Sequence, residues 1–161
     1  MAKAKGQAKE TNGRVADNRK VRFHYHIEET LESGIELLGT EVRSARQGGV
    51  NLSDSYVRIR DGQAWLLNCR IAPYPAASRF NHEPLRERRL LLKRRQIDRL
   101  DGAARQDGYA LVVTAAYFNK EGRLKIEVGL AKGKKLYDKR VAEREKDAKR
   151  EIARALRQRE R

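Results

Sequence analysis

Residues 56–71 read YVRIRDGQAWLLNCRI, and this stretch has the pattern of a β-hairpin. Apolar and polar residues alternate over 56–60 and again over 63–71, as they do on strands with one buried face. Between them lies Asp61-Gly62, which suits a type I′ turn because both of its central residues need positive φ. The hairpin predicts that one face of its second strand joins the core, and that face carries Trp65, Leu67, Cys69 and Ile71.

Further strands are expected on both sides of this hairpin. Every second residue from Val21 to Ile27 is apolar, and the same phase largely resumes over 31–37, where Gly34 marks a bulge or bend. Residues 109–118 predict another strand, which ends in a turn over 119–122. Alternation then returns at Leu124, Ile126, Val128 and Leu130.

Helices are predicted in two places. Residues 40–46 lie between two glycines and fit about two helical turns. Residues 85–106 have apolar residues at helical spacing, with Pro84 suited to a first turn, and predict one helix or a short and a longer one. The fold class is therefore mainly β: a small antiparallel oligonucleotide-binding-like barrel of five or six strands with two or three helices. A half-open sandwich is the structural alternative.

Charge divides the chain into three parts. The whole chain of 161 residues carries 37 Lys and Arg against 22 Asp and Glu, a net charge of +15. Residues 1–20 and 132–161 are basic and contain few Leu, Ile, Val or Phe residues, so they bury too little apolar area to offset their conformational entropy. We expect a basic N-terminal arm (1–20), an RNA-binding barrel (21–131) and a basic C-terminal tail (132–161).

The excess of positive charge predicts a polyanionic partner, such as RNA or a ribosome, or more weakly an anionic membrane surface. Arg and Lys are densest over 86–95, where a helix would display them around Leu90, Leu91 and Leu92. Contacts to backbone phosphates would make binding strongly dependent on salt. The tail has a narrow apolar stripe, and we expect it to be disordered alone and helical against a polyanion.

Signals for catalysis, metals and membranes are weak. The single cysteine, Cys69, excludes an internal disulfide, and no apolar run is long enough to span a bilayer, which predicts a cytoplasmic protein. Residues 129–135 lack the spacing and the Ser or Thr of a phosphate-binding loop. His24 and His26 would share a strand face but lack further metal ligands. We expect no cofactor, no metal site and no catalytic residues, although a magnesium-dependent nuclease built on carboxylates stays open.

Several ordered motifs resemble the SsrA-binding protein family, also called small protein B. The resemblance runs from about residue 18 to 140, and motifs of this length in one order are highly specific. They are Asn18-Arg19-Lys20, Glu32-Ser33-Gly34-Ile35, Gly39 to Ser44, Asn51 to Val57, Arg88 to Leu92 and Leu130 to Arg140.

The resemblance implies a non-catalytic RNA-binding adaptor with an oligonucleotide-binding-like barrel. Such proteins bind the tRNA-like domain of transfer-messenger RNA (tmRNA) and deliver it to stalled ribosomes for trans-translation, with elongation factor Tu an indirect partner in the delivery complex. The tail would reach the decoding centre and the empty mRNA channel. A structural ribosomal protein or general RNA chaperone is the main alternative.

Particular residues match the family's functional positions. The resemblance implies RNA binding by Asn18, Arg19, Lys20, Glu32, Leu91, Lys93, Lys132, Lys134 and Lys135. It implies ribosome binding by the start of the tail, namely Tyr137, Asp138, Lys139 and Arg140. Lys93 departs from the Asn or His common in relatives, which leaves the kind of contact at this position open.

Overall fold

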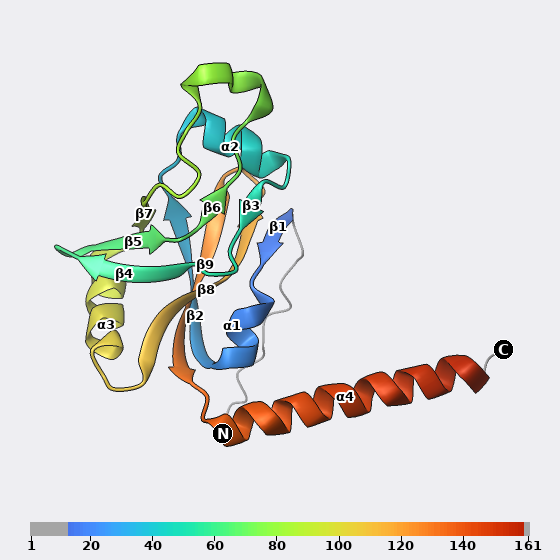
Figure 1. Cartoon of the computed structure of the whole chain (residues 1–161). Coiled ribbons are helices and arrows are strands. Elements are labelled where there is room, and N and C mark those ends of the chain that lie inside the picture. Colours follow the sequence, from blue (N-terminus) through green and yellow to red (C-terminus); the bar gives the residue numbers. More distant parts are fainter. Residues whose placement is uncertain (1–12, 160–161) are drawn as a thin grey trace.

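Six antiparallel strands close into a small barrel in the computed structural model, which describes residues 13–159 (Figure 1). The order around the ring is β8 (Tyr109–Phe118), β4 (Tyr56–Arg60), β5 (Gln63–Leu67), β7 (Arg88–Leu91), β2 (Tyr25–Ile35) and β9 (Leu124–Gly133). A second pairing of β9 with β8 closes the ring. This closure confirms the predicted mainly-β barrel of five or six strands rather than a half-open sandwich.

Two smaller strand groups accompany the ring. β1 (Arg14–Asp17) pairs with β8, and β3 (Val50–Asn51) pairs with β6 (Arg70–Ile71). The barrel interior is apolar, as expected from the alternation in the sequence. Its fully buried side chains include Leu66, Val113, Ala116, Ile126 and Val128.

The hairpin over 56–71 forms the predicted turn but a different buried face. Asp61 and Gly62 have φ of 51° and 70°, as a type I′ turn requires. The fully buried residues of β5 are Ala64 and Leu66, whereas Trp65 is only partly buried. Asn68 has a φ of 54° and ends β5, so the alternation does not carry through to Cys69 and Ile71, which are buried beyond the break.

The predicted strand at residues 21–24 is instead a helix, α1 (Arg19–His24). Asn18 caps it, because its side-chain Oδ1 accepts a hydrogen bond from the backbone N of Val21. His24 therefore ends a helix while His26 lies on β2, so the two do not share a strand face. Of the residues assigned by sequence to the N-terminal arm, 14–17 form β1 and 19–20 begin α1, and residues 1–12 lie outside the described residues.

The predicted helix over 85–106 is correct only in its second half. Residues Arg88–Leu91 form β7, and helix α3 (Arg94–Ala104) follows. β7 buries Arg88 and Leu90 and turns Leu91 outward, so the arginines at 86–89 do not surround a helix. The Arg88 side chain points inward because its guanidinium donates a hydrogen bond to the buried carboxylate of Glu41, which is 47 residues away in the sequence.

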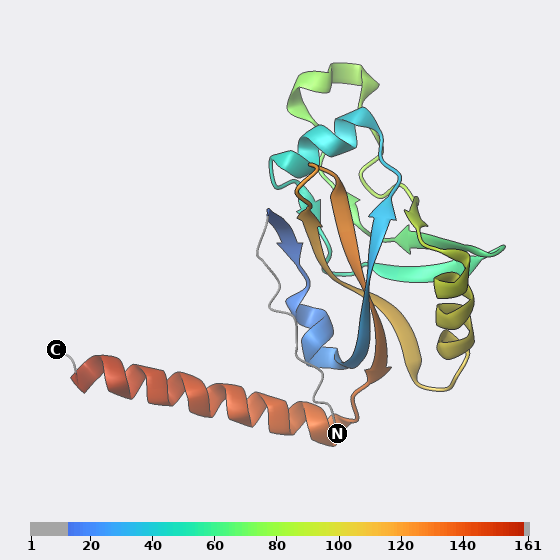
Figure 2. The ribbon, with the colours of Figure 1, turned by 180° about the vertical axis from the view of Figure 1, so that it is seen from behind.

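Helix α2 (Gly39–Arg46), which confirms the prediction over 40–46, lies at one end of the barrel beside the 3₁₀ segment η1 (Pro75–Phe80). Figure 2 shows β2 running the height of the barrel toward this end, alongside β9.

Helix α4 (Leu136–Arg159) projects from the opposite end of the barrel, next to α1 (Figure 1). This helix is formed by residues of the C-terminal tail (132–161). The sequence predicts that the tail is disordered in the free chain, and this stays a prediction. Within residues 13–159, α4 and the shorter helices are all too polar or too short to cross a membrane.

Candidate nucleic-acid interface

Glu32 lies on the outer face of β2, where neighbouring strands supply two partners for its carboxylate. The Tyr117 hydroxyl on β8 donates a hydrogen bond to Oε2, and Lys125 Nζ on β9 lies 3.6 Å from Oε1. The Glu32 side chain is still 53% exposed, so the carboxylate faces solvent in a fixed orientation.

The Tyr117 hydroxyl is held in its donor form. Burial raises the pKa of this hydroxyl, and the hydrogen bond to Glu32 and the negative charges of Glu32 and Glu127 raise it further. The phenol therefore keeps its proton at neutral pH and continues to orient the carboxylate.

Leu91 lies on the same outer face, one strand away from Glu32. Its partner across β2 and β7 is Gly34, and a Cβ built on Gly34 would lie 3.2 Å from the Leu91 Cβ. The missing side chain at Gly34 therefore lets Leu91 stand over β2, where it is 52% exposed. Gly34, Leu91, Lys125 and α2 residue Val42 border a surface hollow of about 380 Å³.

Lys93 follows β7 and starts α3. Its backbone N donates to Gln96 Oε1 at 2.9 Å, and its side chain is exposed. We call Glu32, Leu91, Tyr117 and Lys125, together with Lys93 just beyond β7, the β2 patch: a carboxylate oriented by a tyrosine, an exposed apolar side chain and two lysines.

The predicted basic loop lies at the other end of β9, against α1. Lys134 Nζ donates to the Arg22 carbonyl at 3.1 Å, and its backbone N donates to the His24 carbonyl at 3.0 Å. A cation at the carboxyl end of a helix is favourable because the carbonyl groups there carry partial negative charge. Lys132 lies 5.5 Å from the Tyr109 ring centroid, and Lys135 is exposed.

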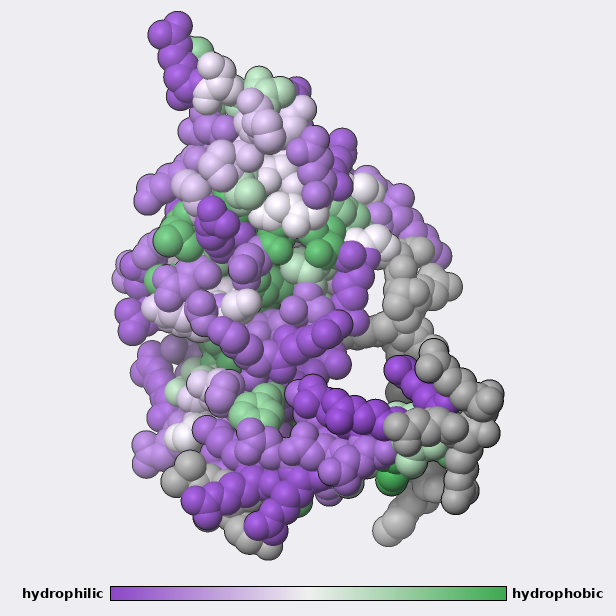
Figure 3. All heavy atoms as spheres, turned by 45° about the vertical axis from the view of Figure 1, so that its right-hand side comes forward, coloured by the Kyte–Doolittle hydropathy of each residue, from purple (hydrophilic) through white to green (hydrophobic). Residues whose placement is uncertain are grey.

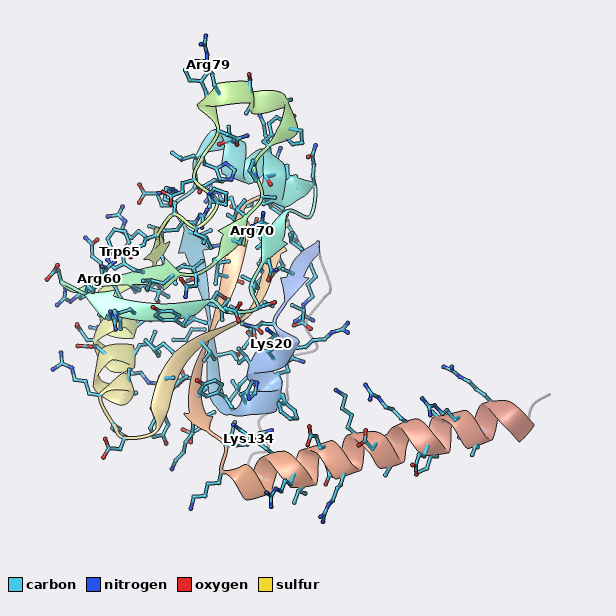
Figure 4. All side chains as sticks on the ribbon, in the orientation of Figure 1. Lys20, Arg60, Trp65, Arg70, Arg79 and Lys134 are labelled. Carbon is cyan, nitrogen blue, oxygen red and sulfur yellow. The ribbon has the colours of Figure 1, made fainter. Side chains whose placement is uncertain are left out.

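The predicted N-terminal residues divide into a buried and an exposed group. Asn18 is 1% exposed and its Nδ2 donates to the Leu52 carbonyl at 2.7 Å, so its side chain is occupied within the fold. Arg19 and Lys20 are exposed, and Lys20 lies 3.6 Å from Asp54. Figure 4 shows Lys20 and Lys134 on the same side of the molecule, near α1.

The predicted ribosome-binding residues form the first turn of α4. Asp138 and Arg140 are exposed and Lys139 is partly buried, whereas the side chain of Tyr137 lies outside the described residues. In Figure 3 hydrophilic residues dominate the lower part of the molecule. The tail start is thus separated along β9 from the β2 patch.

Comparison with known proteins decides the family. The family model described as SmpB protein matches residues 15–158. The chain belongs to the SmpB family. Among similar relatives, the SsrA-binding protein of Symbiobacterium thermophilum is 52% identical over 157 residues, covering 98% of this chain and 97% of that protein. The SsrA-binding protein of Afipia carboxidovorans is 53% identical over 145 residues, covering 90% and 92%.

A solved structure supports the SmpB assignment. It is described as "tmRNA-SmpB: a journey to the center of the bacterial ribosome", and one of its chains matches with a TM-score of 0.64 and 45% identity. The match covers 75% of this chain and 85% of that one. The SmpB family match spans the barrel and nearly all of α4.

Sequence reasoning missed three residues that shape this SmpB surface. Tyr117 is 85 residues from Glu32, and Lys125 meets Glu32 only because β2 pairs with β9. Glu41 binds the Arg86 and Arg88 guanidinium groups, which removes Arg88 from the solvent-facing cluster expected over 86–95. No spacing in the sequence marks these pairs. Within residues 13–159, no group of three His, Cys, Asp or Glu side chains is placed to hold a metal ion.

Proposed function

We propose that this chain is a non-catalytic adaptor that binds the tRNA-like domain of tmRNA and delivers it to stalled ribosomes for trans-translation. The observation that carries the proposal is the β2 patch, which lies on a closed barrel apart from the basic helix α4. SmpB membership and relatives named SsrA-binding proteins support it.

The chemistry of the β2 patch suits folded RNA rather than bare phosphate. Glu32 would be repelled by a phosphate, but its oriented carboxylate can accept a hydrogen bond from a ribose 2′-hydroxyl or a base amino group. Leu91 offers an apolar contact beside it, and Lys93 and Lys125 supply charge for the flanking backbone. A carboxylate flanked by lysines therefore favours an RNA that places a hydroxyl or amino group at Glu32 and backbone phosphates beside it.

The second partner is the ribosome. In this proposal the segment 132–161 carries α4 into the decoding centre and mRNA channel, and the rRNA-lined path favours its positive charge. Lys132, Lys134 and Lys135 contact RNA near the helix root, and Asp138, Lys139 and Arg140 begin the ribosome-directed part. Elongation factor Tu takes part indirectly through the RNA, and the site of action is the cytoplasm, where stalled ribosomes occur.

The RNA recovered with the protein tests this proposal against its alternatives. Tagged protein is isolated from cells at physiological ionic strength, and the co-purified RNA is sequenced and sized. Enrichment of intact tmRNA over ribosomal RNA supports the adaptor. Equal recovery of all ribosomal RNA, without tmRNA enrichment, would support a structural ribosomal protein or RNA chaperone instead. Metal-dependent fragments of the bound RNA would support a nuclease.

A further inference from the structure

The segment 72–84, which includes η1, forms an arm that is clamped to α2 at its base. The Asn81 side chain donates to the Tyr74 carbonyl at 2.7 Å and accepts from the Tyr74 backbone N at 3.0 Å, which closes the loop. Buried His82 lies 2.9 Å from the Thr40 hydroxyl, and the Ser44 hydroxyl donates to the Ala72 carbonyl at 2.6 Å. These contacts hold the arm in one position relative to the barrel.

The tip of the arm presents an aromatic ring to solvent. Phe80 is 80% exposed, and the Arg79 guanidinium lies 5.5 Å from its ring centroid. Ser78 has a φ of 52°, a left-handed conformation that is costly for a residue with a Cβ. Phe80 buries little apolar area, so its side chain adds little to the stability of the fold, and the strain at Ser78, two residues earlier, lowers that stability. This combination points to a role in binding.

The surface at the arm is rich in arginine and poor in free carboxylates. Arg43 of α2 lies 5.9 Å from the Tyr74 ring centroid, and Arg46 follows one turn later. Within residues 13–159, no carboxylate forms an ion pair with Arg43, Arg46 or Arg79. Glu83 is the single carboxylate in the sequence from 72 to 84. Charge here therefore favours a polyanion.

Helix α2 links the arm to the β2 patch. Its residue Val42 borders the hollow beside Leu91, while its Arg43 lies beside Tyr74 of the arm. Figure 4 shows Arg79 pointing away from the barrel at the end opposite Lys134, so the arm lies far from the root of α4. The RNA bound at the β2 patch is thus the polyanion within reach of the arm.

We propose that the arm is a second contact for this RNA, in which Phe80 stacks on an unpaired base and Arg79, Arg43 and Arg46 bind flanking phosphates. Aromatic and arginine side chains commonly hold unstacked bases in this way. The proposal rests on the proposed function, because it needs the chain to bind tmRNA.

Binding of full-length protein to a transcript of the tRNA-like domain tests the arm directly. We expect Phe80→Ala to weaken affinity roughly five- to hundredfold, the range for loss of one stacked base, while Phe80→Trp retains affinity. Arg79→Gln should reduce the slope of log affinity against log salt concentration by about the amount expected for the loss of one phosphate contact. Leu156→Ala, which removes a 58% exposed side chain from α4, is the matched control and should bind like the wild type.

A fluorescent reporter separates stacking from a general loss of affinity. Trp65 is the single tryptophan, so the double substitution Trp65→Phe and Phe80→Trp places the only indole at the tip. Emission that falls in step with RNA saturation supports stacking. The arm contact alone would be overturned by three results together. The emission stays unchanged, Phe80→Ala binds within twofold of the wild type, and Glu32→Ala is still weakened. Failure of the wild type to bind the transcript would overturn the proposed function and the arm with it.

Discussion

Glu41 and Arg88 form an ion pair that is fully buried, with Arg88 Nε 2.8 Å from Glu41 Oε1. The remaining guanidinium protons donate to the Cys69, Arg86 and Pro84 carbonyls, and Arg86 donates to the other carboxylate oxygen. This cluster joins α2 to β7 and to the segment that carries the arm. The donors of Arg88 therefore tie together three segments: α2 through Glu41, the link between β5 and β6 through Cys69, and the stretch before β7 through Pro84 and Arg86.

Glu41→Gln should lower the free energy of unfolding by about 3–5 kcal/mol, because it leaves the Arg88 charge buried without a counter-charge. Urea denaturation followed by circular dichroism measures this. Glu36→Gln is the matched control, since Glu36 pairs with Arg89 at the surface and should cost less than about 1 kcal/mol. Equal effects of the two substitutions would contradict a special role of the buried pair.

The same pair predicts how stability depends on pH. Burial raises the pKa of the Glu41 carboxyl, but hydrogen bonds from Arg86, Leu38 and Arg88 outweigh it, so the pKa lies below the usual 4.5. The folded state therefore gains stability from this group above pH 4.5 and loses it as the pH falls through the lowered value. Denaturation series from pH 7 to pH 3 should show a smaller loss for Glu41→Gln than for the wild type. Parallel curves would exclude Glu41 as a source of acid sensitivity.

Glu32→Ala should weaken binding to the tRNA-like domain by about 1–3 kcal/mol, the range for a charge-assisted hydrogen bond. Titration at constant salt gives the affinity, and Tyr117→Phe should reproduce part of the loss because the carboxylate then lacks its orienting donor. Glu143→Ala, an exposed change on α4, controls for the altered net charge. An unchanged Glu32→Ala affinity would remove the β2 patch from the RNA interface.

Gly34→Ala should weaken RNA binding while changing the free energy of unfolding by less than about 1 kcal/mol. The added Cβ would lie 3.2 Å from the Leu91 Cβ, so β2 and β7 must separate there by a few tenths of an ångström, which displaces the exposed Leu91 side chain. Thermal unfolding and RNA titration of the same preparation check both parts. Gly102→Ala, whose Cβ meets nothing within 4 Å, is the control. A large drop in melting temperature would show that Gly34 serves the fold instead.

A chain ending at Arg140 should bind the tRNA-like domain nearly as well as the full chain, but should fail to support tagging on stalled ribosomes. The reason is that the β2 patch lies on the barrel, whereas the described part of the deleted segment, residues 141–159, belongs to α4. Filter binding and an in vitro tagging assay measure the two activities separately. A hundredfold loss of RNA affinity in the truncated chain would contradict this division.

Local sequence signals predicted the parts of the fold that local chemistry decides. Asp61-Gly62 forms the predicted hairpin turn, and the strand predicted over 109–118 and the alternation over 124–130 correspond to β8 and β9. The prediction failed at residues 21–24, where the Asn18 cap outweighs a period-two pattern, and at Arg88, where a partner 47 residues away overrides local charge. Motif resemblance assigned RNA binding to Glu32 and Leu91, which stays a prediction, and their spatial relation to Tyr117 and Lys125 follows from strand pairing, which no local pattern encodes.

Strand β9 carries Lys125 beside Glu32 at one end and leads through Lys134 into α4 at the other. Since β9 is hydrogen-bonded to β2 and β8 on its two sides, the barrel fixes the separation between Lys125 and the start of α4. In the proposed function, an RNA bound at the β2 patch and a ribosome that holds α4 are therefore kept at a set spacing by one strand.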